Sequence, residues 1–196
     1  MFYVVYQVDG RTDGYVRYRI DHSQRRLTIL ELITATDEAH AALWRFCMGV
    51  DLLDSLEALN RPSDDPLLWM LADPGRLRRE SQIALWLRLV DVPAALSQRR
   101  YAREGKLVIE VRDSTCPWNN SRFQLDGGPD GAQCRSTPAS ADLSLSVADL
   151  ASGYLGATGY RALHSASRIQ EHRPGAIRLL DEMFATEIAP WCAHHF

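Results

Sequence analysis

The chain has 196 residues, of which 46% are hydrophobic and 24% are charged, and its formal net charge at pH 7 is -3. This composition is typical of a soluble globular protein that buries a core in one domain or in two small ones. The slight negative charge gives no electrostatic support to a nucleic-acid partner or an anionic membrane. No apolar run reaches the length of a membrane span, and the first residues lack the charged start of a signal peptide.

The cysteines and histidines indicate neither a disulfide framework nor a metal centre. Cys47, Cys116, Cys134 and Cys192 are widely spaced and form no CxxC pair, which predicts reduced thiols and a cytoplasmic location. His194 and His195 are adjacent, but neighbouring residues point in different directions and no third ligand follows at a fixed spacing. We therefore expect no metal.

Alternation of apolar and polar residues in the first third of the chain predicts four strands, at 2–8, 14–20, 26–33 and 53–59. Asp9-Gly10 joins the first two as a hairpin turn. Thr36 is the predicted cap of a helix that follows the third strand. Its spacing places Trp44 in the core, and Trp69 is expected there too, whereas His40 is predicted to be exposed or to cap the helix.

Asp73-Pro74-Gly75 is a break signal in the chain, and the pattern of predicted strands and helices changes after it. This favours a domain boundary after residue 77. Leu85, Leu87 and Leu89 alternate with Trp86 and Arg88, and this period of two predicts a strand at 81–90. Asp91-Val92-Pro93 then starts a helix over 93–100, with proline in its first turn. Further strands are predicted near 107–112, 121–125, 131–136 and 142–146, and helices over 147–154 and 175–186.

Five motifs in order resemble one family over nearly the whole chain. They are TATDEAHAALW (34–44), DDPLLWML (64–71), LWLRLVDVPAAL (85–96), GGPDGAQC (127–134) and SGYLG (152–156), and they are similar to the Eis-type N-acetyltransferases. Members of that family carry an N-terminal GNAT domain, a second GNAT-like domain and a sterol-carrier-like domain. The resemblance implies that this chain starts inside the second of the three.

The implied fold class is α+β, in two parts. Residues 1–77 would form a partial second GNAT-like domain with an antiparallel sheet and helices. Residues 78–196 would form a sterol-carrier-protein-like sheet with helices on one side.

The resemblance implies acetyl-CoA as the cofactor of the full-length family, but we expect no cofactor in this chain. GNAT proteins hold the pyrophosphate at a glycine-rich turn before a helix. The nearest glycine cluster, Gly127–Gly131, contains a proline and an acid, and a strand is expected to follow it. It is interpreted as a hairpin turn, with phosphate binding as the less favoured alternative.

The family places a C-terminal carboxylate in its active site, so the resemblance implies that Phe196 supplies the general base. An amine must lose a proton to attack a thioester, and a nearby carboxylate can accept it. A frayed terminus is the alternative. Trp86, His195 and Phe196 are the candidate substrate-binding residues, although Trp86 could equally cover the second face of a sheet.

Two departures from the family pattern bear on the acceptor. Relatives that acetylate aminoglycosides tend to carry acids where this chain has Ile83 and His195. Both acids would attract a polycationic acceptor, so we expect aminoglycosides to bind poorly.

The predicted function is the acceptor-side region of an acetyl-CoA-dependent N-acetyltransferase that acts on small-molecule amines. It would be a homo-oligomer, and inactive without an acetyl-CoA-binding domain. One alternative is a module that binds a lipid or another small molecule, and a second is a non-catalytic scaffold. The lipid tunnel would be lined by apolar residues that could equally be core, namely Leu150, Leu155, Leu163, Leu179, Leu180 and Met183.

Overall fold

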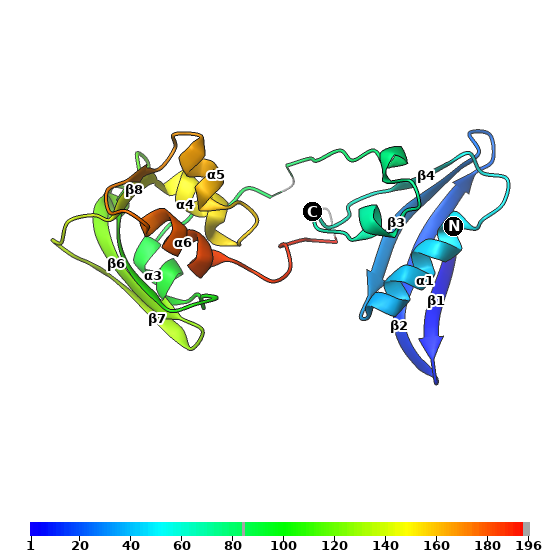
Figure 1. Cartoon of the computed structure of the whole chain (residues 1–196), viewed down its shortest axis with the longest axis horizontal. Helices are drawn as coiled ribbons and strands as arrows, with labels where there is room; N and C mark the ends of the chain where they lie inside the picture. Colours follow the sequence, from blue (N-terminus) through cyan, green and yellow to red (C-terminus); the bar gives the residue numbers. More distant parts are fainter. Residues whose placement is uncertain (84, 194–196) are drawn as a thin grey trace. The chain divides into compact units, whose positions relative to one another are not determined.

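The structure is a computed structural model that describes residues 1–83 and 85–193 (Figure 1). The chain divides into two compact units. The first contains residues 1–82 and also the segment that begins at Trp191, and the second contains residues 83–190. Each unit has a sheet and helices, which confirms the α+β prediction.

The sheet of the first unit has four strands in the order β1-β2-β3-β4. These are β1 (Phe2–Val8), β2 (Arg11–Asp21), β3 (Arg26–Thr34) and β4 (Ser55–Ala58). Asp9 and Gly10 both adopt positive φ, at 50° and 78°, as the predicted hairpin turn between β1 and β2 requires. β1, β2 and β3 are antiparallel, whereas β4 runs parallel to β3. The expectation of a purely antiparallel sheet is therefore wrong. The helix between β3 and β4 carries the chain back to the end of the sheet at which β3 begins, so β4 runs in the same direction as β3.

That helix, α1 (Asp37–Met48), lies against the sheet (Figure 1). It begins at the predicted cap, where the Thr36 hydroxyl accepts a hydrogen bond from the Ala39 amide at 3.2 Å. Its apolar side buries Leu43, Trp44 and Cys47 against Leu27 and other residues of the sheet. Two short helical turns follow β4, namely α2 (Leu67–Met70) and η1 (Pro74–Arg76). Trp69 on α2 is 83% exposed, so its predicted core position is wrong.

The sheet of the second unit has five strands in the order β7-β6-β5-β8-β9. They are β5 (Gly105–Arg112), β6 (Ser121–Gly128), β7 (Gly131–Ser136), β8 (Leu143–Ser146) and β9 (Gln170–Glu171). β5 and β8 are parallel, and the other pairs are antiparallel. Gly128 pairs with Gly131 across a two-residue turn, so the glycine cluster is the predicted hairpin.

One face of this sheet is buried and the other is polar. Leu107, Ile109 and Val111 on β5 are buried, while Lys106 before them and Arg112 after them are exposed. The helices of the unit are α3 (Val92–Ser97), α4 (Val147–Tyr154), α5 (Tyr160–Ser165) and α6 (Ala176–Phe184), and a single-turn η2 (Pro117–Asn119) precedes β6. Residues of α3, α4, α5 and α6 share one core cluster with β5, β6 and β8, so the helices supply the cover of the buried face.

The predicted strand at 81–90 is not observed. The described residues of this segment belong to no strand, and Trp86 is 84% exposed while Leu85 and Leu87 are also exposed. A strand needs a neighbour for its backbone hydrogen bonds, and no strand of the described chain pairs with this segment. The Pro-led helix does follow, with Asp91 accepting from the Ala94 amide at 2.9 Å. The prediction also missed α5 and β9, which are too short to show a clear period.

Candidate functional site

The C-terminal segment is attached to the first unit through Asn60. The indole Nε1 of Trp191 donates to the backbone oxygen of Asn60 at 2.9 Å. In return the side-chain Nδ2 of Asn60 donates to the backbone oxygen of Cys192 at 2.8 Å. Asn60, which lies shortly after β4, thus binds two consecutive residues near the end of the chain.

Arg61 extends this attachment. Its guanidinium carbon lies 5.5 Å from the centre of the Trp191 ring, within the range of a cation–π contact. Its Nη1 donates to the Leu32 backbone oxygen at 2.6 Å, and its Nε donates to Asp65 Oδ2 at 3.0 Å. Arg61 therefore joins the C-terminal segment to the end of β3 and to the loop before α2.

Asp65 is the buried acid of the same cluster. Burial alone would raise its pKa, but hydrogen bonds from His40, the Leu67 amide and Arg61, together with the Arg61 charge, lower the pKa of this carboxyl. His40 Nε2 lies 3.3 Å from Asp65 Oδ1 and 3.0 Å from Trp44 Nε1. Because the indole N–H can only donate, Nε2 either accepts from Trp44 or donates to Asp65. His40 is 9% exposed, which corrects the predicted exposed or capping histidine.

The sequence-predicted site residues are not brought together by the described part of the chain. His195 and Phe196 lie outside the described residues. Trp86 is exposed on the segment before α3, and its role in substrate binding stays a prediction. Asn60 and Arg61 were missed because nothing local marks them as partners of residues about 130 positions further on. Asp65 was missed because its partners, His40 and Arg61, meet it only in the folded chain.

A second polar cluster holds the segment before α3 to the second unit. Arg88 Nη2 donates to Asp113 Oδ1 at 2.6 Å, and Asn119 Nδ2 donates to Asp113 Oδ2 at 3.0 Å. The oxygen of Asn119 accepts from the Val92 amide at 3.1 Å, and Trp118 Nε1 donates to the Val90 backbone oxygen at 2.8 Å. These bonds fix residues 88–92 where they enter α3, so their role is to anchor the segment.

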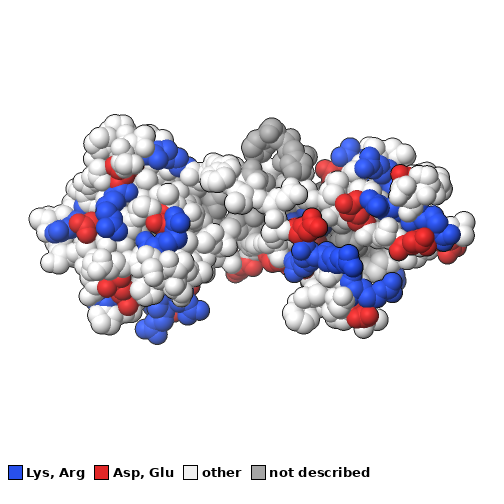
Figure 2. Space-filling model, turned by 90° about the horizontal axis from the view of Figure 1, so that it is seen from above, with Lys and Arg blue, Asp and Glu red and all other residues white. Residues whose placement is uncertain are grey.

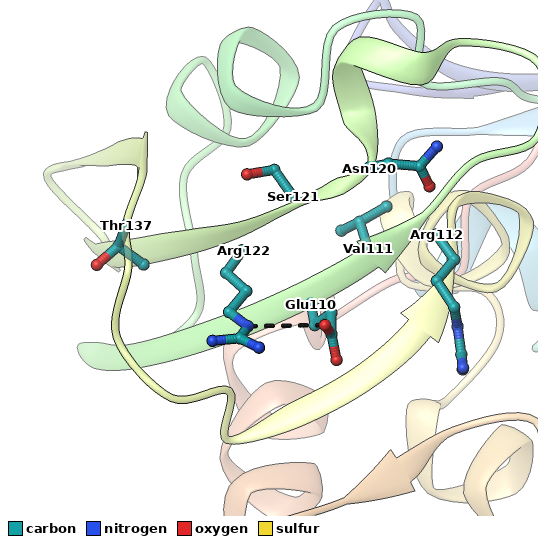
Figure 3. A pocket seen from close by; sticks show the side chains of 7 residues that line it. All are labelled: Glu110, Val111, Arg112, Asn120, Ser121, Arg122 and Thr137. Atoms are coloured by element: carbon teal, nitrogen blue, oxygen red, sulfur yellow. Dashed lines mark ion pairs between the residues drawn. The ribbon is translucent and has the colours of Figure 1, made fainter.

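A shallow hollow of about 420 Å³ lies on the polar face of the second sheet (Figure 3). Glu110 and Arg122 point toward one another across neighbouring strands, with Arg122 Nε 3.6 Å from Glu110 Oε1. Arg112 extends beside this pair, in the same direction, and no dashed line in Figure 3 joins it to either residue. The hollow offers charges of both signs, and on the face drawn in Figure 2 acidic and basic side chains are likewise interspersed on both units. Such a mixed surface suits solvent exposure better than binding of one charged ligand.

Within residues 1–83 and 85–193, no group of three or more His, Cys, Asp or Glu side chains is placed to hold a metal ion. The helices that the structure describes also include none with the length and apolarity needed to cross a bilayer.

Two domain families match the chain. Residues 92–193 match the sterol carrier protein domain, and residues 1–89 match the acetyltransferase (GNAT) domain. The match to the GNAT domain begins at residue 1.

Several curated proteins and solved structures are similar to the chain. An uncharacterized N-acetyltransferase of Streptomyces avermitilis is 42% identical, over 98% of this chain and 49% of that protein. The N-acetyltransferase Eis of Mycobacterium bovis is 37% identical, over 94% of this chain and 45% of that protein. The crystal structure of Eis1 from Mycobacterium abscessus superposes with a TM-score of 0.78 at 36% identity, over 93% of this chain and 48% of that one. The chain therefore spans about half the length of the relatives it matches.

GNAT acetyltransferases use acetyl-CoA, and the described helix N-termini fit its pyrophosphate poorly. Asp37 and Glu38 occupy the first turn of α1, and Asp149 that of α4. At α6 the Glu171 carboxylate accepts from the Ile177 amide at 2.9 Å. Because each of the three longer helices already has a carboxylate at its positive end, a second anion there would be repelled.

Proposed function

This chain belongs to the Eis-like GNAT acetyltransferases with a sterol carrier protein domain, and from that premise we propose that it forms the acceptor side of an acetyl-CoA-dependent N-acetyltransferase acting on small-molecule amines. The proposal places the binding of acetyl-CoA outside the residues of this chain, so that the chain alone transfers no acetyl group. The carboxylates at the helix N-termini support this division.

In the proposed reaction, the carboxylate of Phe196 accepts the proton that the acceptor amine loses as it attacks. His195 and Trp86 contact the acceptor. The observation that carries the proposal is the attachment of the C-terminal segment to the first unit at Trp191 and Cys192. A base must be held at one place to work, and a segment fixed four residues before the terminus supports such a role.

The test joins the chain to an acetyl-CoA-binding GNAT domain from a relative and measures acetylation of a panel of amines. Turnover should require both parts. Deleting Phe196, or extending the chain by a few residues, should abolish turnover without changing the thermal midpoint. Unchanged turnover in both variants contradicts the proposed base. Aminoglycosides should be poor acceptors in this panel, because Ile83 and His195 replace acids.

Three further features belong to the same proposal. The domain boundary lies after residue 77, with a GNAT-like part at 1–77 and a sterol-carrier-like part at 78–196. The protein is a homo-oligomer, which light scattering would test. It works in the cytoplasm.

A second candidate function is binding of a lipid or another apolar molecule, favoured by the sterol carrier protein match over residues 92–193. Leu150, Leu180 and Met183 are fully buried, and Met183 Sδ lies 2.5 Å from where a Cβ on Gly105 would stand. Such close packing supports a core role for these side chains. Titration with a fluorescent fatty acid separates the two functions, since only the second predicts saturable binding by the chain alone.

A further inference from the structure

We propose that Asn60 is a positioning residue that holds the C-terminal segment at Cys192 and so limits where the terminal carboxylate can act. The inference rests on the proposed function, in which that carboxylate accepts a proton. Its geometric basis is the pair of opposed hydrogen bonds at one residue. Asn60 donates from its side chain to Cys192 at 2.8 Å and accepts at its backbone from Trp191 at 2.9 Å.

The residues on both sides of Asn60 are hydrogen-bonded to β3. The Leu59 amide donates to the Ile29 backbone oxygen at 3.0 Å, and the Arg61 guanidinium donates to the Leu32 backbone oxygen at 2.6 Å. Asn60 itself has a φ of 48°, in the left-handed region. Among residues other than glycine, asparagine and aspartate adopt this conformation most readily. Position 60 therefore combines a left-handed turn with a short side chain that ends in a hydrogen-bond donor.

The attachment changes how far the end of the chain can reach. An extended chain advances about 3.3–3.6 Å per residue, so the four residues after Cys192 reach at most ~14 Å from that point. The last described helix, α6, ends at Phe184, which is twelve residues before the terminus. Were α6 the last fixed point, the same arithmetic would give a reach of ~40 Å. The contacts at Trp191 and Cys192 together thus reduce the accessible volume by more than tenfold.

Two substitutions remove the donor while keeping the backbone conformation accessible. Asn60→Gly deletes the side chain at a position where glycine adopts positive φ without strain. Asn60→Asp keeps the shape but turns an acceptor toward the Cys192 carbonyl. The matched control is Gln7→Ala, which removes another side-chain amide bond of the first unit, from Gln7 Nε2 to Thr12 Oγ1 at 3.0 Å.

The first measurement does not depend on acetyl transfer by the protein. The 196-residue chain is digested with a carboxypeptidase, and the loss of Trp191 is followed by intact mass. Because one hydrogen bond is lost, Trp191 should disappear roughly three- to tenfold faster in both Asn60 variants than in the wild-type chain. Gln7→Ala should match the wild-type rate. Equal rates in all four proteins overturn the proposal.

The second measurement uses the chain joined to an acetyl-CoA-binding domain. Both Asn60 variants should lower kcat roughly tenfold or more while KM for the amine stays within about twofold, because a displaced base slows the chemical step and not binding. If turnover needs Phe196 but is unchanged in the Asn60 variants, the positioning role is overturned and the proposed function stands. If deletion of Phe196 has no effect, the proposed function fails, and the positioning role fails with it.

Discussion

At the scale of single residues, each unit has a buried carboxylate that accepts several hydrogen bonds. Asp65 accepts from Arg61 and from the Leu67 amide at the start of α2. Asp113 accepts from Arg88, Asn119 and the amides that precede η2. Burial alone would raise the pKa of Asp113. Hydrogen bonds from Asn119, from the Cys116 and Thr115 amides and from Arg88 outweigh it and hold the pKa well below its usual range.

The lowered pKa of Asp113 makes the stability of the second unit depend on pH. In the unfolded chain an aspartate titrates near pH 3.9, so between that pH and the lower folded value the unfolded state binds more protons. The stabilisation is therefore complete above about pH 4 and is lost as the pH falls through the folded pKa. Asp113→Asn should be less stable at pH 7 and should lose less stability between about pH 4 and pH 2.

Urea unfolding at several pH values measures this slope. Leu107→Ala is the control, because it destabilises the same unit without removing a carboxylate and should keep the wild-type slope. A steep acid dependence that persists in Asp113→Asn would show that other groups are responsible.

At the scale of elements, the hairpin of β6 and β7 depends on the absence of a side chain at one position. A Cβ on Gly127 would lie 2.8 Å from the Cβ of Ala132 and 2.8 Å from the ring of Tyr101. Tyr101 is 2% exposed, and its hydroxyl donates to the Leu96 backbone oxygen at 2.8 Å. The ring is held at both ends, so it cannot move aside.

Gly127→Ala should lower the free energy of unfolding by ~1–3 kcal/mol, the usual cost of overpacking a core. Its neighbour on the same strand provides the control. A Cβ on Gly128 would meet Glu104 Cγ at 2.9 Å, and that side chain is exposed and flexible. Gly128→Ala should therefore cost less than ~1 kcal/mol. Equal losses in the two variants, measured by urea unfolding, would exclude the Tyr101 contact as the cause.

At the scale of the whole molecule, the chain has two hydrophobic cores. One is built around Trp44 and the strands β2 and β3, and the other around β5, β6 and the helices of the second unit. Leu43 belongs to the first core and Leu107 to the second, and both are nearly or fully buried. Substitutions at residues with no shared partners act independently.

Leu43→Ala and Leu107→Ala should each remove ~2–5 kcal/mol from the stability of their own unit only. Hydrogen exchange followed by mass spectrometry should show faster exchange within 1–82 for Leu43→Ala and within 92–184 for Leu107→Ala. Each variant serves as the control for the other. Faster exchange throughout the chain in either variant would indicate that the two cores unfold as one.

The sequence by itself determined the features that depend on neighbours along the chain. The Asp9-Gly10 turn, the Thr36 cap and the Pro-led helix after Asp91 all follow from local periodicity and from residues with special backbone preferences. Five ordered motifs were also enough to indicate the family. These signals work because turns, caps and alternating faces are set by interactions over a few residues.

Tertiary structure alone decided what depends on distant partners. Residues 81–90 have the alternation of a strand but no strand beside them, and His40 is buried because Asp65 and Trp44 surround it. Asn60 and Cys192 are 132 positions apart, and only the folded chain brings the amide of one to the carbonyl of the other. A hydrogen bond between distant residues leaves no periodic signal in the sequence, because its two ends are related by the path of the fold and not by their spacing.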